Sequence, residues 1–167
     1  NYSITTSKNW VAKKNIKKGQ KVNLSNLILK RIDFTKNFNA DFDTIKNKTT
    51  IKLIKKDQKI NFKDVKQNIC AMVSVRSKSE RLKNKWKLNI CGKPTLYHLI
   101  KRLKKSTLLN EIVICTTKNK EDDKIINFAK KNNVKFFRGS ELDVLDRILG
   151  AANKFGNFDH LVRVTGD

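Results

Sequence analysis

Residues 69–75 read Ile-Cys-Ala-Met-Val-Ser-Val, and residues 76–85 after them read Arg-Ser-Lys-Ser-Glu-Arg-Leu-Lys-Asn-Lys. The first stretch has the length and apolar content of a buried strand. The second is a basic loop, and at the carboxyl end of a parallel strand such a loop opens into the ligand crevice of the sheet. Arg76, Arg81 and Lys85 can converge there on a polyanion, for which a nucleoside triphosphate is the natural candidate.

The sequence after this loop alternates between the patterns of helices and strands. Three segments are predicted to be helices: 94–105, 120–132 and 141–155. Three more are short apolar runs typical of strands: 111–117, 134–137 and 161–165. The resulting βαβαβαβ order predicts a mainly parallel sheet with helices on both faces. Its ligand crevice is expected to contain Arg76, Arg138 and Asp167, which follow strands or end them.

The first half of the chain contains an internal repeat at an offset of 38 residues. Residues 16–24 read Ile-Lys-Lys-Gly-Gln-Lys-Val-Asn-Leu, and residues 54–62 read Ile-Lys-Lys-Asp-Gln-Lys-Ile-Asn-Phe. Two copies predict a small pseudo-symmetric β domain and not a solenoid, which needs roughly three repeats or more. In each copy a short strand is expected to meet a tight turn, where Gly19 or Asp57 tolerates a positive φ.

The charge balance is strongly basic. The chain has 38 Lys and Arg against 15 Asp and Glu, a formal net charge of +23. The excess is spread evenly over both halves, which favours a biased composition over a nucleic-acid patch. Residues 76–105 exceed this background, with eleven basic residues against the single Glu80, and this suits phosphate binding. A rival hypothesis is a non-enzymatic basic module that binds nucleic acid or a polyanionic glycan.

The chain ends and the cysteines bear on where the protein works. There is no Met at position 1, and position 167 closes an apparent strand, so we expect a fragment of a longer protein. No apolar run reaches the roughly 18 residues of a membrane span, and no signal peptide opens the chain. Three widely spaced cysteines in apolar surroundings are expected to be reduced core thiols, which favours a cytoplasmic protein: Cys70, Cys91 and Cys115.

Three motifs in the first half point to a known module. They are Trp-Val-Ala-Lys-Lys-Asn-Ile-Lys-Lys-Gly-Gln-Lys-Val at 10–22, Leu-Lys-Arg at 29–31 and Ile-Lys-Leu-Ile-Lys-Lys-Asp-Gln-Lys-Ile at 51–60. Together they resemble a SAF domain, the antifreeze-like β-clip module at the C-terminus of sialic acid synthases. In those synthases a basic side chain of the module can reach the amino-sugar substrate, and the resemblance implies this substrate-binding role for Arg31. A departure is the sequence Ile-Asp-Phe-Thr-Lys at 32–36, where the family has a Pro-Gly-rich stretch.

The second half lacks GxGxxG and GxxxxGK motifs but carries four others in order. They comprise the loop residues Arg76, Ser79, Arg81, Leu82 and Lys85, then Gly-Lys-Pro-Thr-Leu at 92–96, Phe-Arg-Gly-Ser at 137–140 with Asp-Val-Leu-Asp-Arg at 143–147, and Arg-Val-Thr-Gly-Asp at 163–167. This half resembles the cytidylyltransferases that make CMP-activated sugars, including CMP-N-acetylneuraminate synthetases and relatives in spore-coat polysaccharide synthesis. Two departures lie in the loop, where Lys78 replaces a glycine and Lys83-Asn84 replaces Pro-Gly.

The resemblance implies a reaction and a set of roles. A sugar hydroxyl attacks the α-phosphate of CTP and pyrophosphate leaves, so that catalysis depends on positioning and on neutralising phosphate charge. Arg76 and Lys85 take the catalytic roles. Asp167 matches the position that helps to bind Mg²⁺, the implied cofactor. The implied nucleotide-binding residues are Arg76, Ser79, Arg81, Lys85, Ser140, Asp146 and Arg147.

One alternative stays open in this set. Asp143 and Arg147 stand at i and i+4, which also fits an ordinary ion pair on a helix surface.

The sequence therefore predicts a chain of two domains. Residues 1–67 form a small SAF-like β-clip, and residues 68–167 form a truncated, Rossmann-like, mainly parallel α/β nucleotidyltransferase domain. Joining a synthase module to a cytidylyltransferase implies a bifunctional, cytoplasmic, homo-oligomeric parent in sialic acid or surface polysaccharide biosynthesis. The expected partners are CTP and an acidic sugar such as a nonulosonic acid, with no nucleic acid and no membrane.

Overall fold

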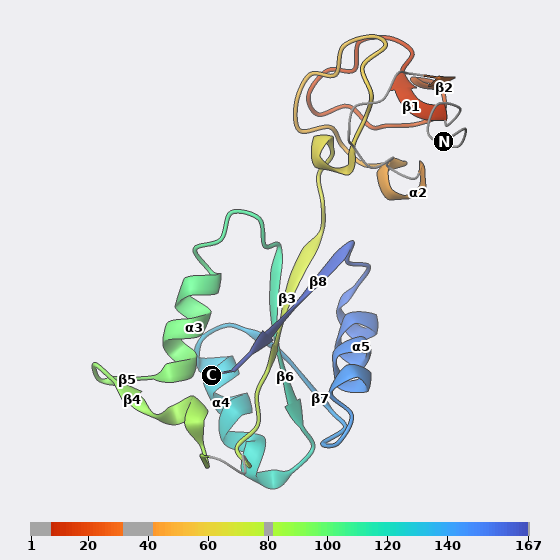
Figure 1. Cartoon of the computed structure of the whole chain (residues 1–167). Coiled ribbons are helices and arrows are strands. Elements are labelled where there is room, and N and C mark those ends of the chain that lie inside the picture. The colour runs from red at the N-terminus through yellow and green to blue at the C-terminus, as the bar shows by residue number, and fades with distance from the viewer. Residues whose placement is uncertain (1–7, 32–41, 79–81, 167) are drawn as a thin grey trace, which may run out of the picture. The chain divides into compact units, whose positions relative to one another are not determined.

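The computed structural model describes residues 8–31, 42–78 and 82–166. The chain divides into two units, Asn1–Gln67 and Asn68–Asp167 (Figure 1).

The second unit is built on a parallel sheet of four strands in the order β7-β6-β3-β8. The strands are β3 (Ile69–Ser74), β6 (Glu111–Thr117), β7 (Lys135–Gly139) and β8 (His160–Thr165). Each strand was expected from its apolar run, and the predicted range 111–117 coincides with β6. The structure confirms a mixed α/β unit with a parallel sheet.

Helices cover both faces of this sheet because side chains along each strand alternate between two cores (Figure 1). Ala71 and Val73 pack with α3 (Thr95–Leu103) and α4 (Asp123–Lys131). Cys70 and Met72 face the opposite way and pack with α5 (Val144–Phe155). Shorter elements complete the unit: η2 (Lys85–Lys87), β4 (Asn89–Ile90), β5 (Lys93–Pro94) and η3 (Lys120–Asp122).

The carboxyl ends of β3 and β8 approach closely at Gly166. Its N–H donates to the Ser74 carbonyl at 2.9 Å, and a Cβ at this position would lie 2.6 Å from Cβ of Val75. Only a residue without a side chain fits this approach unless the two strand ends separate.

We therefore expect Gly166→Ala to destabilise the second unit by about 1–3 kcal/mol, the range for overpacking a tight core. Urea unfolding measures the effect, with the neighbouring exposed Thr165→Ser as control. An equal midpoint for Gly166→Ala and the unsubstituted protein would show that the two strand ends are not in contact at this position.

The first unit has a small core of its own. It contains β1 (Lys8–Ala12), which pairs antiparallel with β2 (Leu27–Arg31), followed by α2 (Phe42–Ile45) and η1 (Phe62–Asp64). Buried apolar side chains from both copies of the repeat and from the segments next to them form the core: Ala12, Ile16, Val22, Leu27, Ile45, Ile54, Ile60 and Val65.

The two copies of the repeat bind each other reciprocally. Ile16 N–H donates to the Ile54 carbonyl at 2.8 Å, and Ile54 N–H donates to the Ile16 carbonyl at 2.9 Å. The turns correspond as well, since Gly19 has a φ of 87° and Asp57 a φ of 63°. The structure thus pairs the two copies of the repeat within one small unit, whereas the pseudo-symmetric β-clip and its resemblance to a SAF domain stay predictions.

The cysteines differ in environment. Cys70 and Cys115 are buried, and burial raises the pKa of these thiols to about 11 and about 12. The prediction of a core thiol is wrong for Cys91, which is exposed because it lies in the turn between β4 and β5 with a φ of 48°. Among the described residues, no helix combines the length and apolar character required to cross a membrane.

Candidate functional site

A pocket of about 390 Å³ opens at the carboxyl edge of the sheet in the second unit. Its walls come from the ends of β3 and β8, from η2 and from the start of α5. Among the described lining residues one is acidic, Glu141, and four are basic: Arg76, Lys85, Arg147 and Arg163. The pocket is therefore suited to an anionic ligand.

The stem of the basic loop is fixed by hydrogen bonds that join its two ends. Asn84 N–H donates to the Ser77 carbonyl at 2.9 Å, and the Trp86 indole N–H donates to Ser77 Oγ at 3.2 Å. Thr95 Oγ1, at the start of α3, donates to the Lys85 carbonyl at 2.7 Å. These contacts bring Arg76 and Lys85, nine positions apart, into the same pocket, as the sequence predicted.

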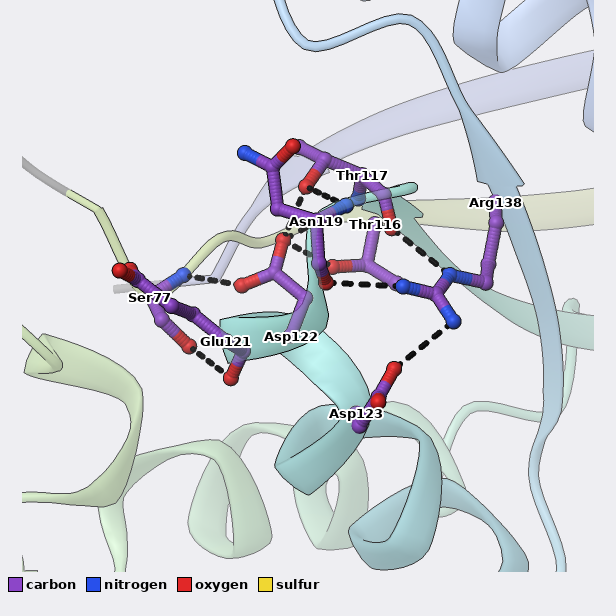
Figure 2. Close-up of polar contacts among 8 residues, drawn as sticks. All are labelled: Ser77, Thr116, Thr117, Asn119, Glu121, Asp122, Asp123 and Arg138. Atoms are coloured by element: carbon purple, nitrogen blue, oxygen red, sulfur yellow. Dashed lines mark hydrogen bonds and ion pairs between the residues drawn. The ribbon is translucent and has the colours of Figure 1, made fainter.

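Asp122 holds the start of this loop against the end of β6 (Figure 2). Its side chain is 2% exposed, and its Oδ1 accepts the Ser77 N–H at 2.7 Å. Its Oδ2 accepts the hydroxyls of Thr116 at 3.0 Å and Thr117 at 2.5 Å, together with the Thr117 N–H at 3.2 Å. One carboxylate therefore connects η3, the loop after β3 and the end of β6.

These hydrogen bonds keep Asp122 ionised. Burial by itself raises the pKa of the carboxyl, but the bonds from Thr117, Ser77 and Thr116 outweigh it, so the pKa of Asp122 is lowered. In the sequence, Asp122 falls in the first turn of the helix predicted at 120–132, and no role in the site was predicted for it. Thr116 and Thr117, which end β6 six and five residues before Asp122, are the feature of the sequence that could have indicated its hydrogen bonds.

Arg138 forms a second set of contacts next to those of Asp122 (Figure 2). Its Nε donates to the Thr117 carbonyl at 2.9 Å, its Nη2 donates to the Asn119 carbonyl at 2.8 Å, and its Nη1 lies 2.8 Å from Oδ1 of Asp123. The sequence placed Arg138 in the ligand crevice. In the structure its guanidinium is engaged by protein groups and joins β7 to the loop after β6.

Arg147 lies in the pocket in an unusual state. It is 1% exposed, and only its Nη2 has a partner among the described residues, the Ser74 Oγ at 3.3 Å. Its Nε and Nη1 have no hydrogen-bond partner there. The open alternative of a surface ion pair with Asp143 is not formed, because Arg147 is buried and Asp143 instead caps α5 by accepting the Asp146 N–H at 2.8 Å.

The environment of Arg147 disfavours its charge. Burial lowers the pKa of its guanidinium, and the nearby charge of Arg76 lowers it further, although Cys115 and Asp122 act in the opposite direction. Space for the side chain comes from Gly139 at the end of β7, where a Cβ would lie 2.9 Å from Cγ of Arg147.

The other predicted site residues lie elsewhere. Ser140 Oγ accepts the Asp143 N–H at 3.0 Å, and the side chain of Asp146 is exposed on α5; neither residue lines the pocket. Arg31 ends β2 in the first unit and is exposed. Three predicted residues lie outside the described ranges: Ser79, Arg81 and Asp167.

The described residues offer few ligands for a metal ion. Within them, no three His, Cys, Asp or Glu side chains gather in a group able to hold a metal ion. The pocket offers one described carboxylate, Glu141, and Mg²⁺ binds poorly to a single carboxylate without further ligands. A metal site is therefore not built from the residues in view.

Comparisons with known proteins concern the second unit. A protein-family model described as Cytidylyltransferase matches residues 70–167. An uncharacterized protein of Methanocaldococcus jannaschii is 44% identical over 99 residues, which are 59% of this chain and 40% of that protein.

Two solved structures are similar to this chain over 60% of its length. A cytidylyltransferase from Leptospira borgpetersenii serovar Hardjo-bovis is 38% identical, with a TM-score of 0.57 over 60% of this chain and 42% of that one. The structure of a CMP:2-keto-3-deoxy-manno-octonic acid synthetase complexed with CTP is 22% identical, with a TM-score of 0.49 over 60% of this chain and 40% of that one. The chain thus spans less than half the length of the proteins that it matches.

Proposed function

The chain belongs to the cytidylyltransferase family, and from this membership we propose that residues 68–167 carry the nucleotide site of a sugar cytidylyltransferase. The enzyme transfers CMP from CTP to an acidic sugar, such as a nonulosonic acid, and releases pyrophosphate. The observation that supports this function is the pocket at the carboxyl edge of the sheet, whose described lining has four basic side chains against one acidic side chain.

The reaction needs what this pocket offers. The sugar hydroxyl forms a bond to the α-phosphorus, the bond from that phosphorus to the oxygen bridging to the β-phosphate breaks, and the hydroxyl proton is released. Negative charge builds up on the departing pyrophosphate, so fixed cations lower the barrier. We assign this role to Arg76 and Lys85, because the fixed loop stem holds both at the pocket.

Further residues complete the proposed site. Ser79 and Arg81 belong to the same loop and are proposed to add contacts to the nucleotide. For Ser140 and Asp146, which do not line the pocket, the nucleotide-binding role stays a prediction. Mg²⁺ is proposed as cofactor, with Asp167 as one ligand; none of the steps above is assigned to the metal.

The first unit has a proposed role of its own. We propose that it is a SAF-like module of a bifunctional, homo-oligomeric and cytoplasmic parent that makes and then activates an acidic sugar, with Arg31 contacting substrate. The support is the reciprocally paired repeat and the motifs at 10–22, 29–31 and 51–60.

Nucleotide selectivity tests the function. The whole chain, with Trp10→Phe so that Trp86 is the fluorescent reporter, is titrated with CTP, UTP, ATP and GTP in the presence of Mg²⁺. We expect CTP to bind at least about tenfold more tightly than the others, a difference of roughly 1.4 kcal/mol. Equal affinities that fall together and steeply with salt would instead support a general polyanion-binding module.

A further inference from the structure

Ser77, the second residue of the basic loop, is held by hydrogen bonds to all of its polar groups. It is 4% exposed, its N–H donates to Asp122 Oδ1 at 2.7 Å, and its Oγ donates to the Glu121 carbonyl at 3.3 Å (Figure 2). Its Oγ also accepts the Trp86 indole N–H at 3.2 Å, and its carbonyl accepts the Asn84 N–H at 2.9 Å. The two ends of the loop therefore meet at this residue.

The two cations assigned to the phosphates adjoin this set of bonds. Arg76 directly precedes Ser77, and Lys85 directly precedes Trp86. The bond between Ser77 and Trp86 thus fixes the distance between the backbone positions from which both cations enter the pocket. A binding site of this kind works only if its charges are held within about 0.5 Å of the positions that the ligand requires.

Asp122 joins these loop ends to the sheet. Its Oδ2 accepts the hydroxyls of Thr116 and Thr117, which end β6, an inner strand with a neighbour on each side. Its Oδ1 holds Ser77. The carboxylate is buried and ionised, so these bonds are charge-assisted and stronger than bonds between neutral groups. Asp122 does not line the pocket, so it can act on a ligand there only through the loop.

We infer that Asp122 is a positioning residue for the pocket, and that through Ser77 it fixes the two loop ends that carry the phosphate-binding cations before a ligand enters. The inference rests on the proposed function for the identity of the ligand, which is the phosphate chain of a nucleotide. Without the bond from Asp122 the ligand itself would have to order the loop ends, and the free energy of ordering them would reduce the affinity. A role confined to stability would leave the affinity of the folded protein unchanged.

Affinity and stability are measured separately on the whole chain, by calorimetric titration with inorganic pyrophosphate and by thermal melting. In Asp122→Asn the affinity of the folded protein for pyrophosphate is expected to fall roughly tenfold or more. The control is Asn110→Ala, which removes a hydrogen bond of 2.9 Å from the Ile69 N–H at the amino end of β3, whereas the pocket lies at the carboxyl end of that strand. The control is expected to melt at a lower temperature and to keep its affinity for pyrophosphate.

Thr117→Val provides a second variant that stays informative if Asp122→Asn does not fold. It keeps the carboxylate and removes a hydroxyl that fixes it to β6, so the affinity is expected to fall roughly threefold to tenfold. Trp86 reports on the loop ends in the Trp10→Phe background. In both variants its emission is expected to differ from that of the unsubstituted chain without ligand. It is expected to return toward that emission as pyrophosphate saturates the pocket, because the ligand then orders the loop ends.

A double variant tests whether Asp122 acts through Ser77. Ser77→Ala removes the acceptor for the Trp86 indole and is itself expected to lower the affinity roughly tenfold. In the combination with Asp122→Asn the loss is expected to be close to the larger single loss, because both substitutions break the same chain of contacts. Single losses that multiply in the double variant would show that Asp122 acts independently of Ser77, and the inference would be wrong.

Three further results would overturn the inference. They are an unchanged pyrophosphate affinity in Asp122→Asn or, where that variant does not fold, in Thr117→Val; an equal loss of affinity in Asn110→Ala; and no binding of pyrophosphate by the unsubstituted chain. Failure of the proposed function is separately visible, because it appears as a lack of CTP preference in the nucleotide titration while pyrophosphate binding still depends on Asp122.

Discussion

Asp122→Asn is expected to destabilise the unit formed by residues 68–167 by about 3–5 kcal/mol, the range for breaking a buried, charged hydrogen-bond network. The asparagine side chain has one oxygen in place of two, and its NH₂ group faces N–H or hydroxyl donors that it cannot satisfy. Because Oδ1 of Asp122 fixes Ser77 and Oδ2 fixes Thr116 and Thr117, either orientation of the amide leaves buried groups unpaired. Urea unfolding of the whole chain, followed by Trp86 fluorescence in the Trp10→Phe background, measures the loss.

Asp123→Asn is the matched control, since Asp123 is the next residue, starts α4, and has a 54% exposed side chain paired with Arg138. Exposed pairs contribute little, so its effect is expected to stay below about 1 kcal/mol. Similar losses for Asp122→Asn and Asp123→Asn would contradict the network described for Asp122.

The same carboxylate makes stability depend on pH. The native pKa of Asp122 lies below its value in the unfolded chain, which is about 3.9. Ionised Asp122 therefore contributes fully to the free energy of unfolding at pH values above the unfolded pKa. This contribution is lost as the pH falls through the lowered native pKa. The stability gap between the unsubstituted protein and Asp122→Asn is expected to narrow on acidification.

Arg76→Ala is expected to lower kcat/KM for CMP transfer in the full-length protein by an amount equivalent to about 2–4 kcal/mol. Arg76 is exposed at the pocket and makes no hydrogen bond or ion pair that the described structure records, so its removal leaves the fold intact while it takes away a cation facing the departing phosphates. The measurement is pyrophosphate release from CTP and an acidic sugar in the presence of Mg²⁺.

Lys87→Ala provides the comparison, because Lys87 is an exposed basic residue of η2 two positions from Lys85 and does not line the pocket. Its turnover should match that of the unsubstituted protein. If Arg76→Ala also retained full turnover, the assignment of the loop to the phosphates would be wrong.

The spacing of apolar residues made the second unit predictable, because each of its strands and helices buries the apolar side chains that this spacing brings to one side. The range 111–117 matched β6, while the helix predicted from 120 divided into η3 and α4, since Asp122 turns inward at the junction. The burial predicted for Cys91 was wrong, because apolar neighbours in the sequence do not determine whether a residue in a turn points to the core or to solvent.

The site was predictable in part. The position of Arg76 and Lys85 at the carboxyl edge followed from strand order alone, because parallel strands end at one edge. The burial of Arg147 and the hydrogen bonds of Arg138 depend on three-dimensional contacts with Ser74 and with the loop after β6. The spacing of residues in the sequence does not encode those contacts. The sequence alone therefore could not decide whether a charged residue in a motif binds a ligand or has a structural role.

The reciprocal bonds between Ile16 and Ile54 make the two copies of the repeat depend on each other. Each copy satisfies backbone N–H and carbonyl groups of the other at this point, and both contribute side chains to the same small core. A chain cut between the copies would leave these backbone groups without their partners and would expose the apolar side chains of each half. We therefore expect the two copies to fold as one cooperative unit, with neither copy stable on its own.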